Sequence, residues 1–240
     1  MKRLVLAAML AIPLLAQPQL ERNTKLVQLK YVDPVAVNAL IDRFGVSSTV
    51  NNQLKVMTLS GTPAQIAAAE AALKQLDVPP KTIELIVHFV VGSDQPNLTG
   101  TAIPADIRDV INQLKGTFTF KDYRMLDTLT LRTRSGSPAE TTGILGSGPN
   151  PRLSMFSIRN ASVTDDGTVR IDRMHAGLRL PMGTRTTETK SGQRTGVEYM
   201  NTGIDQDVDV KEGQKIVVGR SSLEGPEKAL FLILTAKVTQ

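Results

Sequence analysis

The sequence predicts an α+β fold, with a βαββα module over residues 24–80 followed by a mainly antiparallel β domain with one helix over residues 81–240. Two observations predict the module. At two places a side chain that can cap a helix stands directly before a proline, which predicts two helix starts. Runs of mixed apolar and polar residues before and between these places predict the strands. A third observation predicts the second domain, because after Pro80 an alanine-rich helix gives way to alternating segments bounded by turn residues.

Local signals set the boundaries of the module's elements. Residues 25–32 (KLVQLKYV) are typical of a strand, because apolar residues stand among polar ones. Asp33-Pro34 and Thr62-Pro63 each open a helix, since a side-chain oxygen can cap free backbone N–H groups and proline has no N–H to leave unpaired. The second helix, residues 64–76, ends at the Asp77–Pro80 segment, where proline disfavours a further turn.

Between the two helices, residues 46–61 predict a β-hairpin. Two strand-like runs meet at Asn51-Asn52, a pair that tolerates the positive φ of a tight turn. The order of elements is therefore strand, helix, strand, strand, helix, and this order is more informative than any single residue of the module.

The second domain opens with a strand and a helix. Residues 81–93 (KTIELIVHFVVGS) alternate and then become continuously apolar, which is typical of a strand buried on both faces. A helix is predicted from residue 104 to residue 114, with Gly116 as its stop. Its apolar stripe consists of Ile107, Val110, Ile111 and Leu114.

Strands and turns are predicted for the rest of the domain. Residues 121–134 alternate between apolar and polar, as in a half-buried antiparallel strand. Residues 135–151 and 183–194 are polar and rich in turn residues, which predicts surface loops. The pattern as a whole predicts a two-layer sandwich with one helix. Further strands are expected at residues 153–163, 168–180, 195–200, 204–210, 214–220 and 229–238.

The first residues predict export. Lys2 and Arg3 precede an apolar run over residues 4–16, which is short for a membrane span and suits the apolar centre of a signal peptide. We therefore expect a signal peptide over residues 1–17 and export of the protein, with an uncleaved membrane anchor as the alternative.

Composition excludes several classes of chemistry. The sequence contains no cysteine, so disulfides, thiolate catalysis and cysteine-bound metals are excluded. Of the formal net charge of +5, two charges belong to Lys2 and Arg3, and the other basic residues are spread along alternating segments. Nucleic-acid binding, which needs basic side chains gathered on one face, is therefore not expected.

No catalytic, cofactor-binding or metal-binding residue is predicted. The two histidines, His88 and His175, lack the sequence context of a nucleophile site, and a hydrogen-bonded or partly exposed strand position is expected for His88. Met174 and Met182 flank His175, but a Met/His copper site needs ligands that converge. Core packing is the favoured role of these methionines.

Acidic residues gather in two places. The Asp165-Asp166-Gly167 segment predicts a hairpin turn, since Asp accepts local backbone hydrogen bonds and Gly supplies a positive φ. Asp205, Asp207 and Asp209 alternate, which puts three carboxylates on one face of a strand. A solvated sheet surface or subunit contact is favoured over a cation site, because the glycine at the fixed offset of a calcium loop is missing.

Residues 59–80 (LSGTPAQIAAAEAALKQLDVPP), followed by the strand KTIELIVHFV, resemble the small periplasmic ring-building domains of bacterial secretins. In that family these domains stack side by side into rings that line a secretion channel, so the resemblance implies protein–protein association rather than chemistry. A charge change at Glu70 is expected to weaken such assembly without unfolding the module. The helix face expected to pack on the module's own sheet, with a neighbouring copy as the alternative, consists of Ala64, Ala67, Ala68 and Ala71.

The other end of the chain carries a second resemblance. The segment GIDQDVDVKEGQKIVVGR, followed by ALFLILTAKV, is similar to the end of the secretin core domain, with Glu212-Gly213 as a turn and Gly219 as the end of an apolar strand. Between these last two strands the family carries a longer insert with gate elements, where this sequence has a polar linker over Ser221–Lys228. The resemblance implies a degenerate or truncated core without an obvious pair of amphipathic membrane hairpins.

Together the resemblances imply an exported secretin-like envelope protein that acts through protein–protein assembly, in protein secretion such as type II secretion or in type IV pilus biogenesis. They imply a homo-oligomer with partners in a secretion or pilus machine, no enzymatic activity and no cofactor, with outer-membrane association as an option. Two alternatives stay open. One is a monomeric periplasmic adaptor or ligand-binding module without channel activity, and the other is a hydrolase whose site has no recognised motif.

Overall fold

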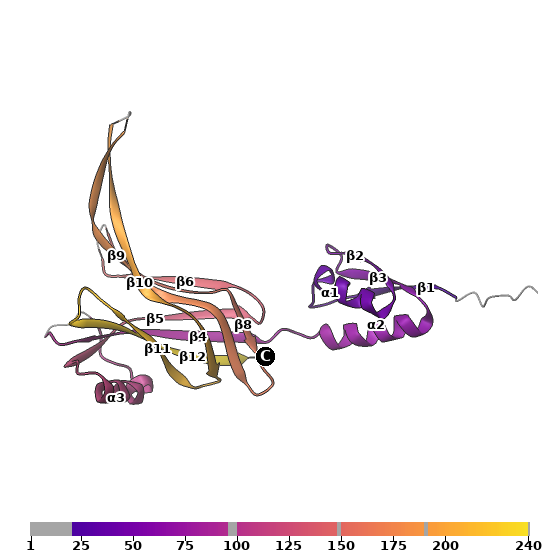
Figure 1. The fold of residues 1–240 in the computed structure, drawn as a ribbon, viewed down its shortest axis with the longest axis horizontal. Coiled ribbons are helices and arrows are strands. Elements are labelled where there is room, and N and C mark those ends of the chain that lie inside the picture. Colours follow the sequence, from indigo (N-terminus) through magenta and orange to yellow (C-terminus); the bar gives the residue numbers. More distant parts are fainter. Residues whose placement is uncertain (1–20, 96–99, 148–149, 190–191, 240) are drawn as a thin grey trace, which may run out of the picture. The chain divides into compact units, whose positions relative to one another are not determined.

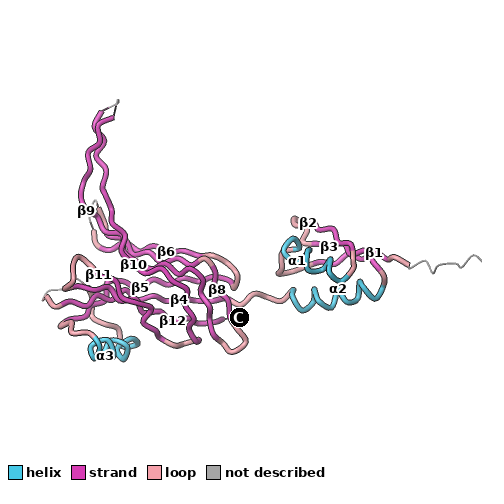
Figure 2. The backbone as a smooth tube through the Cα atoms, viewed as in Figure 1, coloured by secondary structure: helices cyan, strands magenta, loops and turns pink. Residues whose placement is uncertain are grey.

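The computed structural model describes residues 21–95, 100–147, 150–189 and 192–239, so the predicted signal peptide lies outside the described residues. The chain divides after Pro79 into two compact units, which we call unit 1 and unit 2 and describe separately. Mostly antiparallel strands and three α-helices make up the described part, which confirms the predicted α+β class (Figure 1; Figure 2). None of the helices in the described ranges is long and apolar enough to cross a membrane.

Unit 1 is a three-stranded antiparallel sheet with two α-helices packed against it. β3 lies in the centre and pairs with β1 and β2. Met57 and Leu59 of β3 are fully buried, together with Ile41 of the first helix and Ala69 of the second. The first strand is shorter than predicted. In chain order the elements are β1 (Asn23–Gln28), α1 (Pro34–Ile41), the 3₁₀ turn η1 (Asp42–Phe44), β2 (Ser47–Asn51), β3 (Val56–Gly61) and α2 (Pro63–Leu76).

Both helices of unit 1 begin where the sequence predicts. The Asp33 carboxylate accepts a hydrogen bond from the backbone N–H of Val35 at 2.8 Å. Thr62 and Gln65 form a capping box, in which each side chain accepts a hydrogen bond from the other residue's backbone N–H. The second helix ends at Leu76, also as predicted. Local signals are therefore sufficient to place these helices.

The predicted hairpin of unit 1 is present, but its turn lies further along the chain than expected. β2 continues through Asn51, so residues 52–55 form the connection to β3. The residue with a positive φ is Lys55, at 55°, and neither Asn51 nor Asn52 has one. Instead the side-chain oxygen of Asn51 accepts a hydrogen bond from the backbone N–H of Leu54 at 3.1 Å, which organises a longer turn.

The alanine-rich face of α2 is exposed, so the expectation that it packs on its own sheet is wrong. The residues of α2 that are buried against the sheet are Ile66, Ala69 and Leu73. Because an α-helix makes one turn in 3.6 residues, residues on the side of α2 opposite these three point away from the sheet. The exposed alanines are Ala64, Ala67, Ala68 and Ala71.

Unit 2 is a sandwich of two antiparallel sheets with one helix on an outer face (Figure 1). One sheet has the strand order β11-β12-β4-β5, and the other has the order β10-β9-β7-β6 with β8 beside β9. The central strand β12 is buried on both faces over most of its length, and β4 alternates as far as Ile86 and is buried on both faces from Val87, as predicted for residues 81–93. In chain order the elements are β4 (Thr82–Ser93), the 3₁₀ turn η2 (Ala105–Ile107), α3 (Arg108–Thr117), β5 (Asp122–Arg134), β6 (Ala139–Leu145), β7 (Arg152–Ile158), β8 (Asn160–Val163), β9 (Thr168–Thr189), β10 (Gly192–Lys211), β11 (Lys215–Ser222) and β12 (Lys228–Thr239).

Unit 2 has a core on each side of its four-stranded sheet. Between the two sheets, Phe89 of β4 and Phe156 of β7 are fully buried. On the other side, η2 and α3 bury their apolar stripe against Phe231 of β12, which confirms the predicted stripe. Gly116 does not end the helix as predicted, because α3 continues to Thr117 and Gly116 lacks the positive φ of a glycine cap.

Two segments predicted as loops are strands in the structure. The segment 135–151 contains β6, which pairs with β7 along its whole length. Of the segment 183–194, residues 183–189 belong to β9 and residues 192–194 to β10, and the predicted strands 195–200 and 204–210 are parts of the same strand β10. Threonine and glycine are compatible with extended backbone, so pairing with a neighbouring strand decides the structure here.

The last strands differ from prediction in one respect. Gly213 has a φ of 75° in the turn after β10, as expected. Gly219, however, lies inside β11 at a break in its register with β12, and β11 continues to Ser222. A Cβ on Gly219 would lie 2.8 Å from Cδ1 of Ile204, so glycine here allows β10 to pass close to β11.

Candidate functional site

A long hairpin of β9 and β10 extends beyond the sandwich of unit 2 (Figure 1). β7 accompanies β9 only as far as the pair Leu153–Arg179. We call residues 180–200 the ribbon. In the described part of the chain, β9 and β10 pair with each other throughout the ribbon, and the outer edge of each strand has no strand partner. The ribbon is therefore a two-stranded element with two open edges.

The ribbon begins at a β-bulge. Glu198 pairs with Gly183 and the next residue, Tyr199, pairs with Pro181, so Met182 has no partner in the register. A bulge bends a strand and increases its twist. The side chain of Met182 is 63% exposed, so the bulge presents an apolar group to solvent at the start of the ribbon.

Just below the ribbon the two backbones approach more closely than side chains allow. Gly177 and Gly203 lie opposite each other. A Cβ on Gly177 would lie 2.4 Å from the carbonyl oxygen of Thr202, and a Cβ on Gly203 would lie 2.6 Å from the carbonyl oxygen of Ala176. Glycine is therefore required at both positions for this close approach.

Two side-chain pairs flank the glycines, one on each side. Toward the sandwich, Nδ1 of His175 lies 2.7 Å from a carboxylate oxygen of Asp205. Toward the ribbon, the guanidinium of Arg179 lies 4.7 Å from the ring centroid of Tyr199, which is a cation–π contact. Both pairs connect β9 to β10, so they hold the strands together where the glycines have no side chains to do so.

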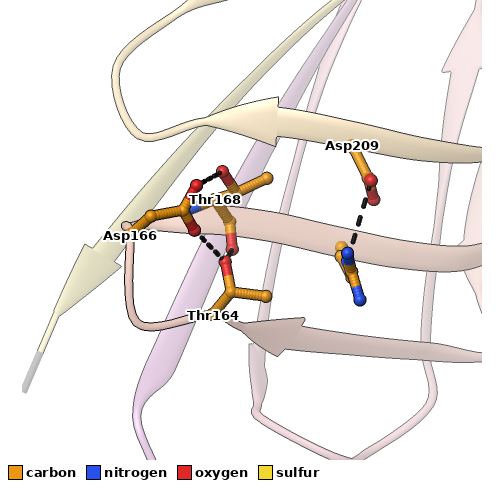
Figure 3. Close-up of polar contacts among 5 residues, drawn as sticks. Thr164, Asp166, Thr168 and Asp209 are labelled. Carbon is orange, nitrogen blue, oxygen red and sulfur yellow. Dashed lines mark hydrogen bonds and ion pairs between the residues drawn. The ribbon is translucent and has the colours of Figure 1, made fainter.

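The three alternating aspartates are exposed on β10, as predicted, and each has a partner on β9. Asp205 belongs to the pair described above. Asp207 accepts a hydrogen bond at 2.7 Å from the backbone N–H of Arg173, which has a φ of 48° in a second bulge of β9. Asp209 forms an ion pair with Arg170 at 3.7 Å (Figure 3). Within the described ranges, no group of three or more His, Cys, Asp or Glu residues could hold a metal ion.

The predicted turn at Asp165-Asp166-Gly167 joins β8 to β9 (Figure 3). The Asp166 carboxylate accepts hydrogen bonds from the Thr164 hydroxyl and, at 2.9 Å, from the Thr168 hydroxyl. The backbone N–H of Thr168 donates a third bond at 3.3 Å. These bonds, with the Thr164 hydroxyl as the strongest, stabilise the charged carboxylate and lower the pKa of Asp166 to about 2.

Of the two strand positions predicted for His88, hydrogen-bonded or partly exposed, the structure shows the hydrogen-bonded one. His88 is buried on β4, with Nδ1 3.0 Å from the hydroxyl of Thr128 and Nε2 3.8 Å from the carboxylate of Asp106. Burial lowers the pKa of His88, and the negative charge of Asp106 offsets part of that effect. Burial therefore favours the neutral form of His88, which packs within the sheet beside Thr128.

The residues considered for a Met/His copper site do not converge. Met174 is fully buried in the core between the sheets, which confirms core packing for this residue. His175 contacts the exposed Asp205, and Met182 is exposed at the bulge.

In unit 1, one carboxylate fixes the loop between β1 and α1. Asp77, the C-cap of α2, accepts hydrogen bonds from the backbone N–H groups of Lys30 at 2.8 Å, Tyr31 at 2.7 Å and Val32 at 3.1 Å. Burial raises the pKa of Asp77, but the three N–H groups outweigh burial, so the pKa lies below its ordinary 3.8. The sequence indicated only that the helix stops here.

Sequence reasoning missed the Gly177–Gly203 pair and the contacts that flank it. A signal was present, because a glycine inside a strand pattern often marks a close backbone approach. The partner of each glycine depends on the register of β9 with β10, however, and one bulge changes that register.

No protein-family model and no curated protein matches the sequence. Solved structures do match the fold. The type IV competence pilus secretin PilQ of V. cholerae aligns over 91% of this chain and 77% of its own, with 12% identity and a TM-score of 0.54. The type II secretin GspD of enteropathogenic Escherichia coli aligns over 91% and 88%, with 11% identity and a TM-score of 0.56. The T2SS secretin XcpQ of Pseudomonas aeruginosa aligns over 95% of this chain and 77% of its own, with 14% identity and a TM-score of 0.56.

The fold is secretin-like. Unit 2 alone spans Pro80–Gln240, so an alignment over 91% or more of the chain has to include residues of unit 1 as well. The secretin-like fold confirms the resemblance seen at both ends of the sequence.

Proposed function

We propose that this chain is an exported envelope protein that assembles with copies of itself and with other proteins of a secretion or pilus machine, without catalysing a reaction. The observation that carries the proposal is the secretin-like fold over both units. The solved structures with this fold are named as secretins of type II secretion and of a type IV competence pilus. Protein secretion or type IV pilus biogenesis is the corresponding process for this chain.

The ribbon supports a homo-oligomer. Each ribbon strand has one edge whose N–H and C=O groups lack a strand partner in the described residues, and such edges pair readily with another chain. Because β9 and β10 are antiparallel, the open edge of β9 in one copy can pair with that of β10 in the next. A contact between two different edges is heterologous, and it closes into a ring when the rotation between copies allows.

In this proposal, residues 1–17 are a signal peptide, residues 24–80 a ring-building βαββα module and residues 81–240 a secretin-core-like domain. The protein works in the periplasm and contacts the outer membrane as an assembly. It needs no cofactor and no nucleic acid.

The exposed alanine face of α2 supports contact between modules, because small side chains permit close approach of a neighbour. Glu70 is a poor position to test this face, since its carboxylate pairs with Nζ of Lys25 at 2.7 Å and a charge change would also break that contact. Ala68→Glu introduces charge on the exposed face while leaving the Lys25 pair intact, and we expect it to weaken assembly.

The deciding measurement is the absolute mass of the protein lacking residues 1–16, determined by light scattering over a range of concentrations. A discrete ring-sized species, seen as closed rings by electron microscopy, is the expected result. A monomer at every concentration would overturn the proposal and favour the alternative, a monomeric periplasmic adaptor or ligand-binding module without channel activity.

Two exposed apolar residues allow a matched test of the ribbon. Met182→Glu puts a charge on the ribbon, and we expect the ring-sized species to be lost. Ile144→Glu is the control, since Ile144 is 70% exposed on β6, outside the ribbon. Equal behaviour of the two variants would remove the ribbon from the contact surface.

A further inference from the structure

Unit 2 contains a cavity of about 400 Å³ at the end of the sandwich where the ribbon begins. The cavity lies between the two sheets, because β4 and β5 contribute to one wall and β6 and β9 to the other. Its apolar lining consists of Val91, Leu126, Leu145, Leu178, Leu180 and Leu223.

The course of β9 explains why this end of the sandwich is open. Leu178 and Leu180 are buried and point into the space between the sheets. The bulge at Met182 then directs β9 away into the ribbon, where Met182 is exposed. β9 therefore stops contributing inward side chains at the cavity. Side chains that line a void lose packing contacts, so an apolar group that enters restores them.

The size and lining of the cavity are those of a ligand site. Such sites are typically about 300–1,000 Å³ and mostly apolar, with a few polar groups that fix orientation. A cavity of about 150 Å³ is already large enough to bind benzene. This cavity is more than twice that size, so it has room for an alkyl chain rather than a single ring.

The rim of the cavity carries two cations and one carboxylate. A guanidinium nitrogen of Arg152 lies 3.5 Å from one oxygen of Glu224, and Nζ of Lys228 lies 3.2 Å from the other. All three residues line the cavity. One carboxylate shared by two cations leaves one positive charge in excess within this group. An anionic head group is therefore the complement of the rim.

We propose that the cavity binds a free fatty acid, with its alkyl chain among the leucines and its carboxylate at Arg152 and Lys228. The apolar walls recognise the chain, and the excess positive charge recognises the head group. The cavity between the sheets accommodates one chain, which distinguishes a free fatty acid from a two-chain phospholipid. This binding does not require ring assembly, so it stands or falls independently of the proposed function.

Calorimetric titration of the protein lacking residues 1–16 tests the proposal, with dodecanoate below its micellar concentration as the probe. We expect saturable binding of one dodecanoate per chain. Dodecanol, which has the same chain without the charge, is expected to bind about tenfold more weakly, because one charge-assisted contact is worth roughly that factor. Absence of saturable dodecanoate binding would overturn the proposal, as would binding to phosphatidylglycerol vesicles alone.

Variants at neighbouring positions of β6 test the location. Leu145→Trp fills the cavity and is expected to abolish dodecanoate binding, whereas Ile144→Trp, on the exposed face of β6, is expected to leave it unchanged. Equal binding by both variants would overturn the assignment. If Leu145→Trp fails to fold, Arg152→Ala tests the proposal instead. This variant is expected to bind dodecanoate about tenfold more weakly and dodecanol with unchanged affinity. An equal loss of affinity for both probes would refute the role of the rim.

Discussion

Units 1 and 2 differ in what determines their secondary structure. In unit 1, residues within one turn of each other fix the helices, as with Asp33 and Val35 or Thr62 and Gln65. In unit 2, β6 and the ribbon become strands because another strand lies beside them. The difference shows that local signals specify the helices of unit 1, whereas pairing with a neighbouring strand specifies these strands of unit 2. Substitutions at closely defined positions test this contrast.

The largest effect is expected at Gly177, where two paired strands leave no room for a side chain. Gly177→Val forces β9 and β10 apart, and we expect the free energy of unfolding of unit 2 to fall by about 3 kcal/mol in urea denaturation. Gly183→Val on the same strand is the control, because a Cβ there meets no atom within 4 Å. Its expected change is within about 0.5 kcal/mol. Equal losses would refute a special role for the glycine pair.

A smaller loss is expected when the Asp77 carboxylate, which holds the loop between β1 and α1, is removed. Asp77→Ala leaves three backbone N–H groups without their acceptor, and we expect the free energy of unfolding of unit 1 to fall by about 2 kcal/mol. Glu70→Ala, which removes only a partly exposed ion pair, is expected to cost less than about 1 kcal/mol. Hydrogen exchange of the Tyr31 amide identifies the site of the loss. Unchanged exchange there would contradict this explanation.

The same carboxylate gives unit 1 a defined pH dependence. The pKa of Asp77 in the folded protein lies below 3.8, so its stabilising contribution is fully present above about pH 4. That contribution is lost as the pH falls through the lower, folded-state pKa. The stability difference between the wild type and Asp77→Ala should therefore shrink in acid. A difference that stays constant from pH 6 to pH 2 would rule out the charged carboxylate as its source.

Loss of a single helix cap is expected to have a still smaller effect. Thr62→Ala removes the hydroxyl of the capping box, and we expect a loss of about 1 kcal/mol in the stability of unit 1. Thr62→Ser keeps a hydroxyl and should retain most of that stability. If both variants lose the same amount, the threonine methyl group rather than the cap is responsible.

The smallest effect is a local titration in unit 2. We expect NMR titration of the Asp166 carboxyl carbon to give a pKa of about 2. Thr164→Val removes a hydroxyl donor and should move that pKa toward the ordinary 3.8. Thr142→Val, on another strand of the same sheet, is the control and should leave it unchanged. A pKa near 3.8 in the wild type would show that the turn hydrogen bonds do not persist in solution.

The contrast between the units also explains which parts of the fold were predictable. The predictions of the two helix starts of unit 1 and of the buried strand β4 depend on residues close together in sequence, and all three predictions are confirmed. The orientation of α2 was predicted wrongly, because alanines lie on several sides of this helix and do not show which side faces the sheet. The larger Ile66 and Leu73 carry the burial and were the better signal. β6 could not be predicted from its own residues, since its polar composition suits a loop equally well until β7 pairs with it.

The candidate site was predictable only in part. Alternation was enough to place Asp205, Asp207 and Asp209 on one exposed face of a strand. Their partners were not predictable, because the contact between Asp207 and the Arg173 backbone exists only where β9 carries a bulge. A bulge inserts an extra residue into one strand and so changes its register with the partner strand. The sequence of the bulged strand alone does not show where that insertion lies.

The pairing of β4 with β12 sets an order of events during synthesis. β4 is made early in unit 2, yet its partner strand contains the last described residues, so Thr82 pairs with Thr239 and Ser93 pairs with Lys228. Such distant pairing closes slowly, because the long loop between the strands must first be brought together. The sheet with the order β11-β12-β4-β5 therefore cannot be completed until translation has passed residue 239. The hairpins between β4 and β12 in the sequence can form before that, while the sandwich is still open.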